Sequence, residues 1–116
     1  MLINLSALKF GVTAAIKRHV HRRLTAATAR TADSVTRTIV RLWDINGTRG
    51  GVDKACRVVV WLRGRGTIVV EAVDRDLYAA IDAAATKLRG AVSRHHKRRR
   101  TLRREHALRR VRRLPA

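Results

Sequence analysis

Hydrophobic residues recur at every fourth position near the start of the chain, which is the spacing of one face of a helix. These positions are Val12, Ile16, Val20 and Leu24. Thr13 stands at the head of the pattern and can cap or open the helix. With about 100° between successive residues, the basic side chains of the segment fall on the opposite side, so the pattern predicts an amphipathic helix with a cationic outer face. A short apolar run before it, residues 2–5, predicts a first or edge strand.

Three strand-like segments follow, in residues 35–45, 54–63 and 67–73. Each is rich in β-branched residues and alternates between two faces, as a half-buried strand does. A glycine-rich loop at residues 46–51 and a tight turn at residues 64–66 separate them. Before the first of them, we expect the alanine- and threonine-rich stretch 25–34 to let the helix end in a loop.

A second helical stripe begins after the strands. It consists of Leu77, Ile81, Ala84, Leu88 and Val92. Their spacing of three or four predicts the strongest helix in the chain, and Asp74 or Asp76 supplies its N-terminal acceptor. The resulting order is β-α-β-β-β-α. Because each helix has one apolar stripe and the strands have one apolar face, we expect an α+β fold in which a four-stranded sheet packs both helices on one face.

The net charge of the chain indicates the kind of partner that this fold binds. The 116 residues include twenty-seven Lys and Arg against eight Asp and Glu, for a formal net charge of +19. This balance predicts a polyanionic partner, either nucleic acid or an anionic membrane surface. No apolar run approaches the roughly 18 residues of a membrane span, so we expect nothing to span a membrane. We divide the chain into a domain at residues 1–98 and an arginine-rich tail at residues 99–116, which should extend the last helix, fray when free and order on a polyanion.

Seven basic residues on the outer helical faces are the candidates for contacts with RNA phosphates. They are Lys17, Arg18, Arg22, Lys87, Arg94, Lys97 and Arg98. A solvated charged surface is the ordinary explanation for such residues, but eight acids cannot neutralise twenty-seven bases on any fold. We therefore expect a basic ridge of two adjacent helices that contacts phosphates. Aromatic residues make up only 3% of the chain, which disfavours recognition by stacking of many bases.

Other reactive residue types point to structural roles. The five histidines lack the spacing of a metal site, and we expect Cys56, on the inward face of a strand, to be a core residue. A single cysteine cannot form an internal disulfide and no secretory signal precedes the domain, which predicts a reducing, cytoplasmic location. We expect no cofactor, no metal, no small-molecule substrate and no enzymatic activity. Trp43 and Trp61 should form a cross-strand pair on the exposed face of the sheet, or part of a patch for a partner.

The second helix and the strand before it resemble those of a known family. Val70-Glu71-Ala72 precedes the segment Asp76-Leu77-Tyr78-Ala79-Ala80-Ile81-Asp82. This order is similar to that of the ribosome hibernation promoting factor family, which includes the ribosome-associated inhibitors. Lys87-Leu88-Arg89 and the basic stretch 94–98 follow as in that family, and residues 12–17 resemble the opening of its first helix. The resemblance covers about residues 1–98 and implies the same β-α-β-β-β-α fold.

The resemblance implies a non-enzymatic protein of stress or stationary phase that binds the small ribosomal subunit and its ribosomal RNA. Members of the family lodge in the channel for messenger RNA and transfer RNA and inhibit translation by occupying it. Tyr78 is shared with the family, and both packing between helix and sheet and an RNA-facing role are open for it. The chain is similar to the short members, which lack a ribosome-pairing domain, and we expect a monomer off the ribosome. Its arginine-rich tail leaves open whether it promotes or prevents ribosome pairing.

Two other functions fit the same charge. A general double-stranded RNA-binding protein also packs two helices on one face of an antiparallel sheet. Its lysine cluster at the start of the last helix is replaced here by Asp74-Arg75-Asp76, which disfavours phosphate contact at that place. A structural ribosome-associated or nucleoid protein would bind mainly through the tail. Deletion of residues 99–116 separates this last case from binding through the helices.

Overall fold

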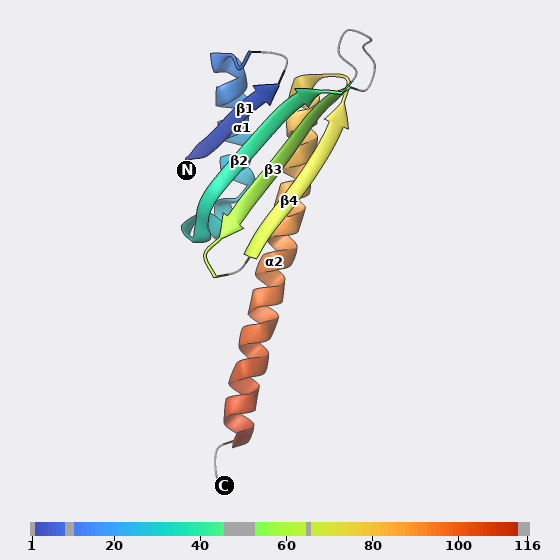
Figure 1. The fold of residues 1–116 in the computed structure, drawn as a ribbon. Helices are drawn as coiled ribbons and strands as arrows, with labels where there is room; N and C mark the ends of the chain where they lie inside the picture. The colour runs from blue at the N-terminus through green and yellow to red at the C-terminus, as the bar shows by residue number, and fades with distance from the viewer. Residues whose placement is uncertain (1, 9–10, 46–52, 65, 114–116) are drawn as a thin grey trace.

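Two layers make up the fold, a four-stranded sheet and a pair of helices that cover one of its faces (Figure 1). A computed structural model describes residues 2–8, 11–45, 53–64 and 66–113. The elements are β1 (Ile3–Leu8), α1 (Ala14–Ala27), the 3₁₀ helix η1 (Ala29–Ser34), β2 (Val35–Asp44), β3 (Lys54–Leu62), β4 (Gly66–Asp74) and α2 (Leu77–Arg113). The expected α+β class and the order β-α-β-β-β-α are confirmed.

The strands lie side by side in the order β1-β2-β3-β4. The edge strand β1 runs parallel to β2, and the other neighbours are antiparallel. This arrangement follows from the connections, because a parallel pair needs a long crossover such as α1. At the turn between β3 and β4, Gly64 and Gly66 have φ angles of 64° and 84°, which glycine adopts without steric cost. The expected loop at residues 46–51 lies outside the described residues, as does Arg65 of the turn.

Hydrophobic residues of the predicted faces form one core between the sheet and the helices. The inward residues of β3 meet both helical stripes. The largest hydrophobic side chains buried there are Val20, Leu24, Val40, Leu42, Val58, Val60, Ile81, Leu88 and Val92. Burial of each such side chain contributes roughly 1.5–3 kcal/mol. The core therefore holds both helices against the same face of the sheet.

Side-chain hydrogen-bond acceptors lie at or just before the start of each helix. The Thr13 hydroxyl accepts a hydrogen bond from the backbone N–H of Ile16 at 3.2 Å, which caps α1 as predicted. In the turn before α2, the carboxylate of Asp74 accepts a hydrogen bond from the backbone N–H of Asp76 at 3.1 Å. Of the two aspartates expected to supply an acceptor, Asp74 thus makes a side-chain bond at the start of α2.

The segment after α1 is wound, and the expected loop at residues 25–34 is wrong. α1 continues to Ala27, and η1 follows almost at once. The Thr28 hydroxyl donates to the carbonyl of Leu24 at 2.9 Å, and the Thr31 hydroxyl donates to the carbonyl of Thr28 at 3.4 Å. Both threonines are buried. These hydroxyls satisfy carbonyls at the end of α1 and just before η1, and the wound segment packs against α2.

The helix α2 continues well past the sheet. At a rise of about 1.5 Å per residue, its 37 residues make a helix about 55 Å long. Figure 1 shows its second half projecting beyond the sheet. Val92 is the last buried residue among its described side chains, and residues 97, 98 and 100–109 are exposed. The expected extension of the last helix into the tail is confirmed as far as Arg113.

Within the described residues, no helix covers the other face of the sheet (Figure 1). Both tryptophans lie there, but Trp43 pairs with Ala55 and Trp61 pairs with Arg37, so the expected tryptophan pair is wrong. The two rings would be opposite each other only if β2 and β3 were shifted by six positions. Instead, the Arg37 guanidinium carbon lies 5.3 Å from the ring centroid of Trp61, in a cation–π contact.

Three charged residues close the end of the β2–β3 pair. Lys54 donates hydrogen bonds from Nζ to Asp44 at 2.9 Å and to Asp53 at 3.1 Å. These bonds, first that to Asp44 and then that to Asp53, raise the pKa of Lys54 above its usual value. Asp53 is buried. Because the positive charge of Lys54 is neutralised by these two carboxylates, Lys54 is not a candidate for contact with nucleic acid.

Candidate nucleic-acid interface

Positive charge is concentrated on the two helices, including the part of α2 that projects beyond the sheet. α1 and α2 together contain seventeen Lys and Arg and two acidic residues, Asp82 and Glu105. The remaining ten basic and six acidic residues belong to the rest of the chain. The two helices thus account for fifteen of the nineteen net positive charges. A polyanion is therefore attracted mainly to the helices.

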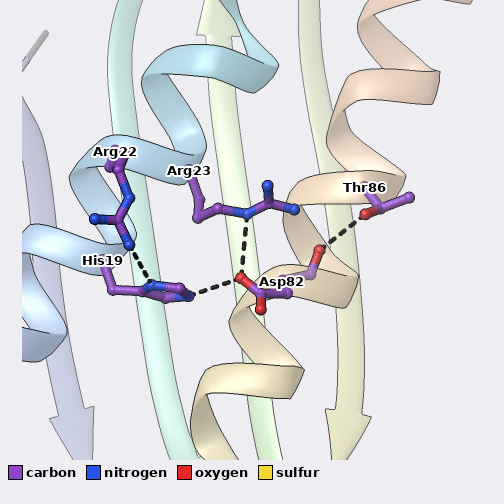
Figure 2. A network of polar contacts seen from close by, with 5 residues as sticks. All are labelled: His19, Arg22, Arg23, Asp82 and Thr86. Atoms are coloured by element: carbon purple, nitrogen blue, oxygen red, sulfur yellow. Dashed lines mark hydrogen bonds and ion pairs between the residues drawn. The ribbon is translucent and has the colours of Figure 1, made fainter.

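A polar contact around Asp82 joins the two helices (Figure 2). Oδ1 of Asp82 lies 2.7 Å from Nε2 of His19 and 3.1 Å from Nε of Arg23, both of which belong to α1. Nδ1 of His19 lies 3.2 Å from Nη2 of Arg22. Because a guanidinium only donates hydrogen bonds, Nδ1 must accept, and Nε2 holds the proton that is donated to Asp82. His19 therefore links Arg22 of α1 to Asp82 of α2.

Tyr78 lies at the same contact between the helices. Its ring centroid is 5.0 Å from that of His19, and the planes meet at 72° in an edge-to-face arrangement. The residue is 37% exposed. Tyr78 thus packs against a side chain of α1 and keeps part of its surface open to solvent.

The structure distributes the predicted contact residues over different parts of the helical layer. At one edge, Lys17 lines a pocket together with Asn4 of β1. At the other edge, Lys87 donates a hydrogen bond from Nζ to the carbonyl of Glu71 in β4 at 2.7 Å. Arg22 lies between these edges, at the contact around Asp82 (Figure 2). The candidate surface is therefore broad and spans the layer from β1 to β4.

The remaining predicted residues complete this surface. Arg94 and Arg98 follow Lys87 by seven and eleven residues, which places all three along one side of α2. The Arg94 guanidinium folds back over Gly90, where an added Cβ would lie 3.4 Å from its Nη1. Arg18 and Lys97 point away from the core by helical position. All seven side chains are exposed and so are accessible to a partner.

Two arginines near the helix–helix contact were missed by the sequence analysis. Arg23 lies only about 20° from Ile16 around α1, so periodicity alone assigns it to the apolar side. Its long side chain instead reaches Asp82 on the other helix. Arg89 follows Asp82 by seven residues, about two turns, and is exposed on the same side of α2. The unbalanced Asp82 between two basic helices was the available signal for this site.

A further basic cluster lies where η1 meets α2. A pocket of about 310 Å³ is lined by Arg30 and Asp33 of η1 and by His96, Arg100 and Arg103 of α2, among others. Three arginines against one aspartate leave an excess of positive charge that favours a phosphate. Sequence reasoning had no signal for this pocket, because it joins segments about seventy residues apart whose contact depends on the winding of η1.

Three other kinds of functional site depend on a reactive thiol, a cluster of metal ligands or a membrane-spanning helix. Burial raises the pKa of the Cys56 thiol to about 12, so this thiol is a core group with little thiolate character. In the part of the chain that the structure describes, no three His, Cys, Asp or Glu side chains are grouped so that they could hold a metal ion. Within the same residues, no helix is both long and apolar enough to cross a membrane.

Known structures and families share this architecture. The N-terminal domain of Protein Y from Thermus thermophilus is 30% identical, with 79% of this chain and 93% of that chain covered and a TM-score of 0.65. A ribosomal subunit interface protein from Coxiella burnetii is 20% identical, with 84% of this chain and 99% of that chain covered and a TM-score of 0.69, and it supports the fold alone. Among curated protein sequences, none matches the chain.

The family model of the sigma 54 modulation protein / S30EA ribosomal protein matches residues 3–100. The match covers the whole sheet, α1 and the part of α2 that packs on the sheet. The resemblance seen in residues 70–82 is confirmed. The chain belongs to the sigma 54 modulation protein / S30EA ribosomal protein family, whose members are ribosome-associated proteins.

Proposed function

We propose that this protein is a hibernation factor that binds the small ribosomal subunit in the channel for messenger RNA and transfer RNA. In this proposal it inhibits translation by occluding the channel. The observation that supports it most is the concentration of fifteen net positive charges on two helices of a fold whose family is ribosome-associated. A solved structure with the same fold is described as a ribosomal subunit interface protein.

The proposed contact surface is the exposed side of α1 and α2. The side chains proposed to contact phosphates are Lys17, Arg18, Arg22, Lys87, Arg94, Lys97 and Arg98, together with Arg23 and the exposed Arg89. The link through His19 and Asp82 holds the two helices together, so RNA meets a surface that is already formed. Tyr78, partly exposed beside His19, is positioned to meet a base or sugar at the same contact. Contact with six to ten phosphates would lower affinity about 10³–10⁵-fold between 50 and 200 mM salt, by analogy with duplex DNA.

The tail at residues 99–116 is proposed as an accessory arm of the domain at residues 1–98. It contains eight arginines and one glutamate. Because its described side chains are exposed, it adds phosphate contacts without contributing to the core. The protein needs no cofactor or small-molecule substrate for this function, and it acts in the cytoplasm as a monomer until it meets a ribosome under stress.

A general double-stranded RNA-binding function is the second candidate. The start of α2 argues against it, because Asp74 and Asp76 stand where such a domain presents lysines to the RNA. The Asp74 carboxylate is also engaged with the backbone N–H of Asp76 at 3.1 Å. Two carboxylates at this position repel phosphates, which favours the ribosomal proposal.

Sedimentation with isolated ribosomal subunits tests the proposal. The full chain is mixed with small or large subunits at about 150 mM salt in the presence of excess competitor RNA. The test variant is Lys87→Glu/Arg94→Glu on the helical layer. The matched control is Arg63→Glu/Arg75→Glu, which changes the charge by the same amount at exposed turn residues outside the two helices. We expect saturable one-to-one binding to the small subunit, lost in the first variant and kept in the second.

Two outcomes would contradict the proposal. Equal binding to both subunits that competitor RNA abolishes would indicate a non-specific basic RNA binder. Equal loss of binding in both charge-reversal variants would mean that net charge, and not the helical layer, determines association.

A further inference from the structure

The face of the sheet that the helices leave uncovered in Figure 1 combines apolar and positively charged side chains. Its apolar members are exposed or half-buried, and they are Ile39, Trp43, Val59, Trp61, Val69 and Val73. Arg37, Arg41 and Arg57 on the two central strands are exposed among them. The proposed ribosomal contact uses the helical layer on the other side of the sheet and leaves this face without a role.

Two arginines face each other at the centre of this surface. Arg41 of β2 is directly in register with Arg57 of β3, and like charges in this arrangement repel. Glu71 of β4 is the next residue in the row. Among the described residues, however, neither Arg41 nor Arg57 is within ion-pair distance of a carboxylate. An anion placed between the two guanidinium groups would relieve their repulsion and accept hydrogen bonds from both.

Each tryptophan lines a pocket beside this arginine pair. One pocket, of about 560 Å³, is lined by Trp43 and Leu8 together with both arginines. The other, of about 230 Å³, is lined by Trp61, Ile39 and Val59 together with the same two arginines. Along β2, Trp43 is two residues from Arg41 and the residue opposite Trp61 is four residues from it. At about 3.4 Å per residue, the indoles therefore lie roughly 7 and 14 Å to either side of the pair.

We infer that this face is a second nucleic-acid site, which binds a short segment of single-stranded RNA. A phosphate would lie between Arg41 and Arg57, and the flanking bases would stack in the Trp43 and Trp61 pockets. The two ring pockets lie too far apart for neighbouring bases, so the bound segment extends over several nucleotides, with stacked bases toward its ends and a phosphate between them at the arginine pair. An acidic peptide matches the cations but does not require a flat apolar pocket on each side. Sheets that bind single strands use two or three rings, so a low aromatic content is sufficient when both rings share one face.

The contact between Arg37 and Trp61 is consistent with such stacking. A planar cationic group already lies over the indole, 5.3 Å from its centroid. A base can stack on the guanidinium plane or take its place on the ring, and Arg37 then pairs with the next phosphate. Three arginines and two indoles thus form one surface across β2 and β3.

Indole fluorescence measures this face selectively, because Trp43 and Trp61 are the two tryptophans of the chain. We would titrate the full chain with a six-nucleotide oligoadenylate RNA and, separately, with inorganic polyphosphate of similar charge. The test variant is Arg41→Gln/Arg57→Gln, and Arg75→Gln is a control that removes a positive charge away from this face and from the tail. Trp43→Phe and Trp61→Phe each leave one indole as a reporter. Far-ultraviolet circular dichroism verifies that every variant is folded.

We expect saturable quenching of both indoles by the oligonucleotide and little quenching by polyphosphate. The Arg41→Gln/Arg57→Gln variant should bind at least about tenfold more weakly, because two charge-assisted hydrogen bonds are lost. Its slope of log affinity against log salt should be smaller by about 0.7, the change for the loss of one phosphate contact on a single strand. The control should keep the affinity within about threefold, and Lys87→Glu/Arg94→Glu should keep the quenching, which separates this site from the ribosomal contact.

Several results would overturn the inference. Quenching by polyphosphate as strong as that by RNA would mean a simple anion site. Unchanged affinity in Arg41→Gln/Arg57→Gln would remove the central phosphate contact. Quenching by an oligoglutamate peptide but not by RNA would make the face a protein-binding surface, and quenching that depends on protein concentration alone would make it an interface between two copies.

Discussion

Removal of the tail at residues 99–116 should weaken the affinity for RNA and leave the free energy of unfolding nearly unchanged. Ending the chain after Arg98 deletes eight arginines and one glutamate, a net charge of +7. The buried residues of α2 end at Val92, and the described side chains of residues 100–109 are exposed. Arg100 and Arg103 also lie beside Arg30 in the η1–α2 pocket, so their removal relieves repulsion between like charges. The packed layers should therefore remain intact.

The structure indicates the size of each effect. A helical segment whose described side chains are exposed rests mainly on its own helix propensity, so we expect the free energy of unfolding to change by less than about 1 kcal/mol. The helical signal in circular dichroism should fall by about three tenths, because fifteen of the 51 residues in α1 and α2 are deleted. Each phosphate contact that is lost should reduce the slope of log affinity against log salt by about 0.7–0.9. For eight arginines the slope could fall by up to about 7.

Urea unfolding and small-subunit sedimentation of both chains measure these quantities. The shortened chain should still saturate small subunits at one molecule each, with a weaker affinity and a shallower dependence on salt. Loss of binding at every salt concentration would show that the tail, and not the helical layer, forms the site. A loss of stability above about 2 kcal/mol would refute the assignment of the tail as a segment outside the core.

Three further predictions concern the core and the turn. Leu88→Ala should lower the free energy of unfolding, measured in urea, by about 3–5 kcal/mol, because Leu88 is fully buried. The control Leu108→Ala should change it by less than about 0.5 kcal/mol, because Leu108 is 56% exposed. Equal effects of the two substitutions would contradict the packing of α2. Burial raises the pKa of Cys56 from 9.0 to about 12, so the thiol of the unfolded chain ionises first and the free energy of unfolding should fall as pH rises from 9 to 12. Urea titrations at several pH values measure this dependence, which should be weaker in the Cys56→Ala variant. Rapid alkylation of the native thiol at pH 8 would argue against its burial. Gly64→Ala should lower the free energy of unfolding, measured by thermal denaturation, by about 1–2 kcal/mol, because the φ of 64° at this position is strained for alanine. Gly64→Asn should lower it less. An unchanged free energy of unfolding in Gly64→Ala would refute the turn geometry.

Local spacing was sufficient to predict which faces of the elements are buried. The stripe from Ile16 to Leu24 and the alternation along β3 both depend on residues a few positions apart, and the structure buries the expected sides. The cap at Thr13 is local in the same sense, since its partner is the N–H of Ile16. These features determine how each element packs, so the two-layer architecture follows from them.

Features that depend on distant segments escaped sequence reasoning. The register of β2 and β3 is a property of the whole pair, and it places Trp43 opposite Ala55 instead of near Trp61. The reach of Arg23 to Asp82 depends on the length of its side chain and on the distance between the helices. For the same reason, the sequence identified the residues of the candidate surface but not their arrangement. Lys17 and Lys87, for example, lie at opposite edges of the helical layer.

Competition for the channel of the small subunit is the most direct test of the proposed function. Small subunits are sedimented with the full chain either empty or after assembly of a stable complex with messenger RNA and transfer RNA. We predict one molecule of the protein on each empty subunit and almost none on filled subunits. Equal binding to empty and filled subunits would contradict occlusion of the channel as the way in which this protein inhibits translation.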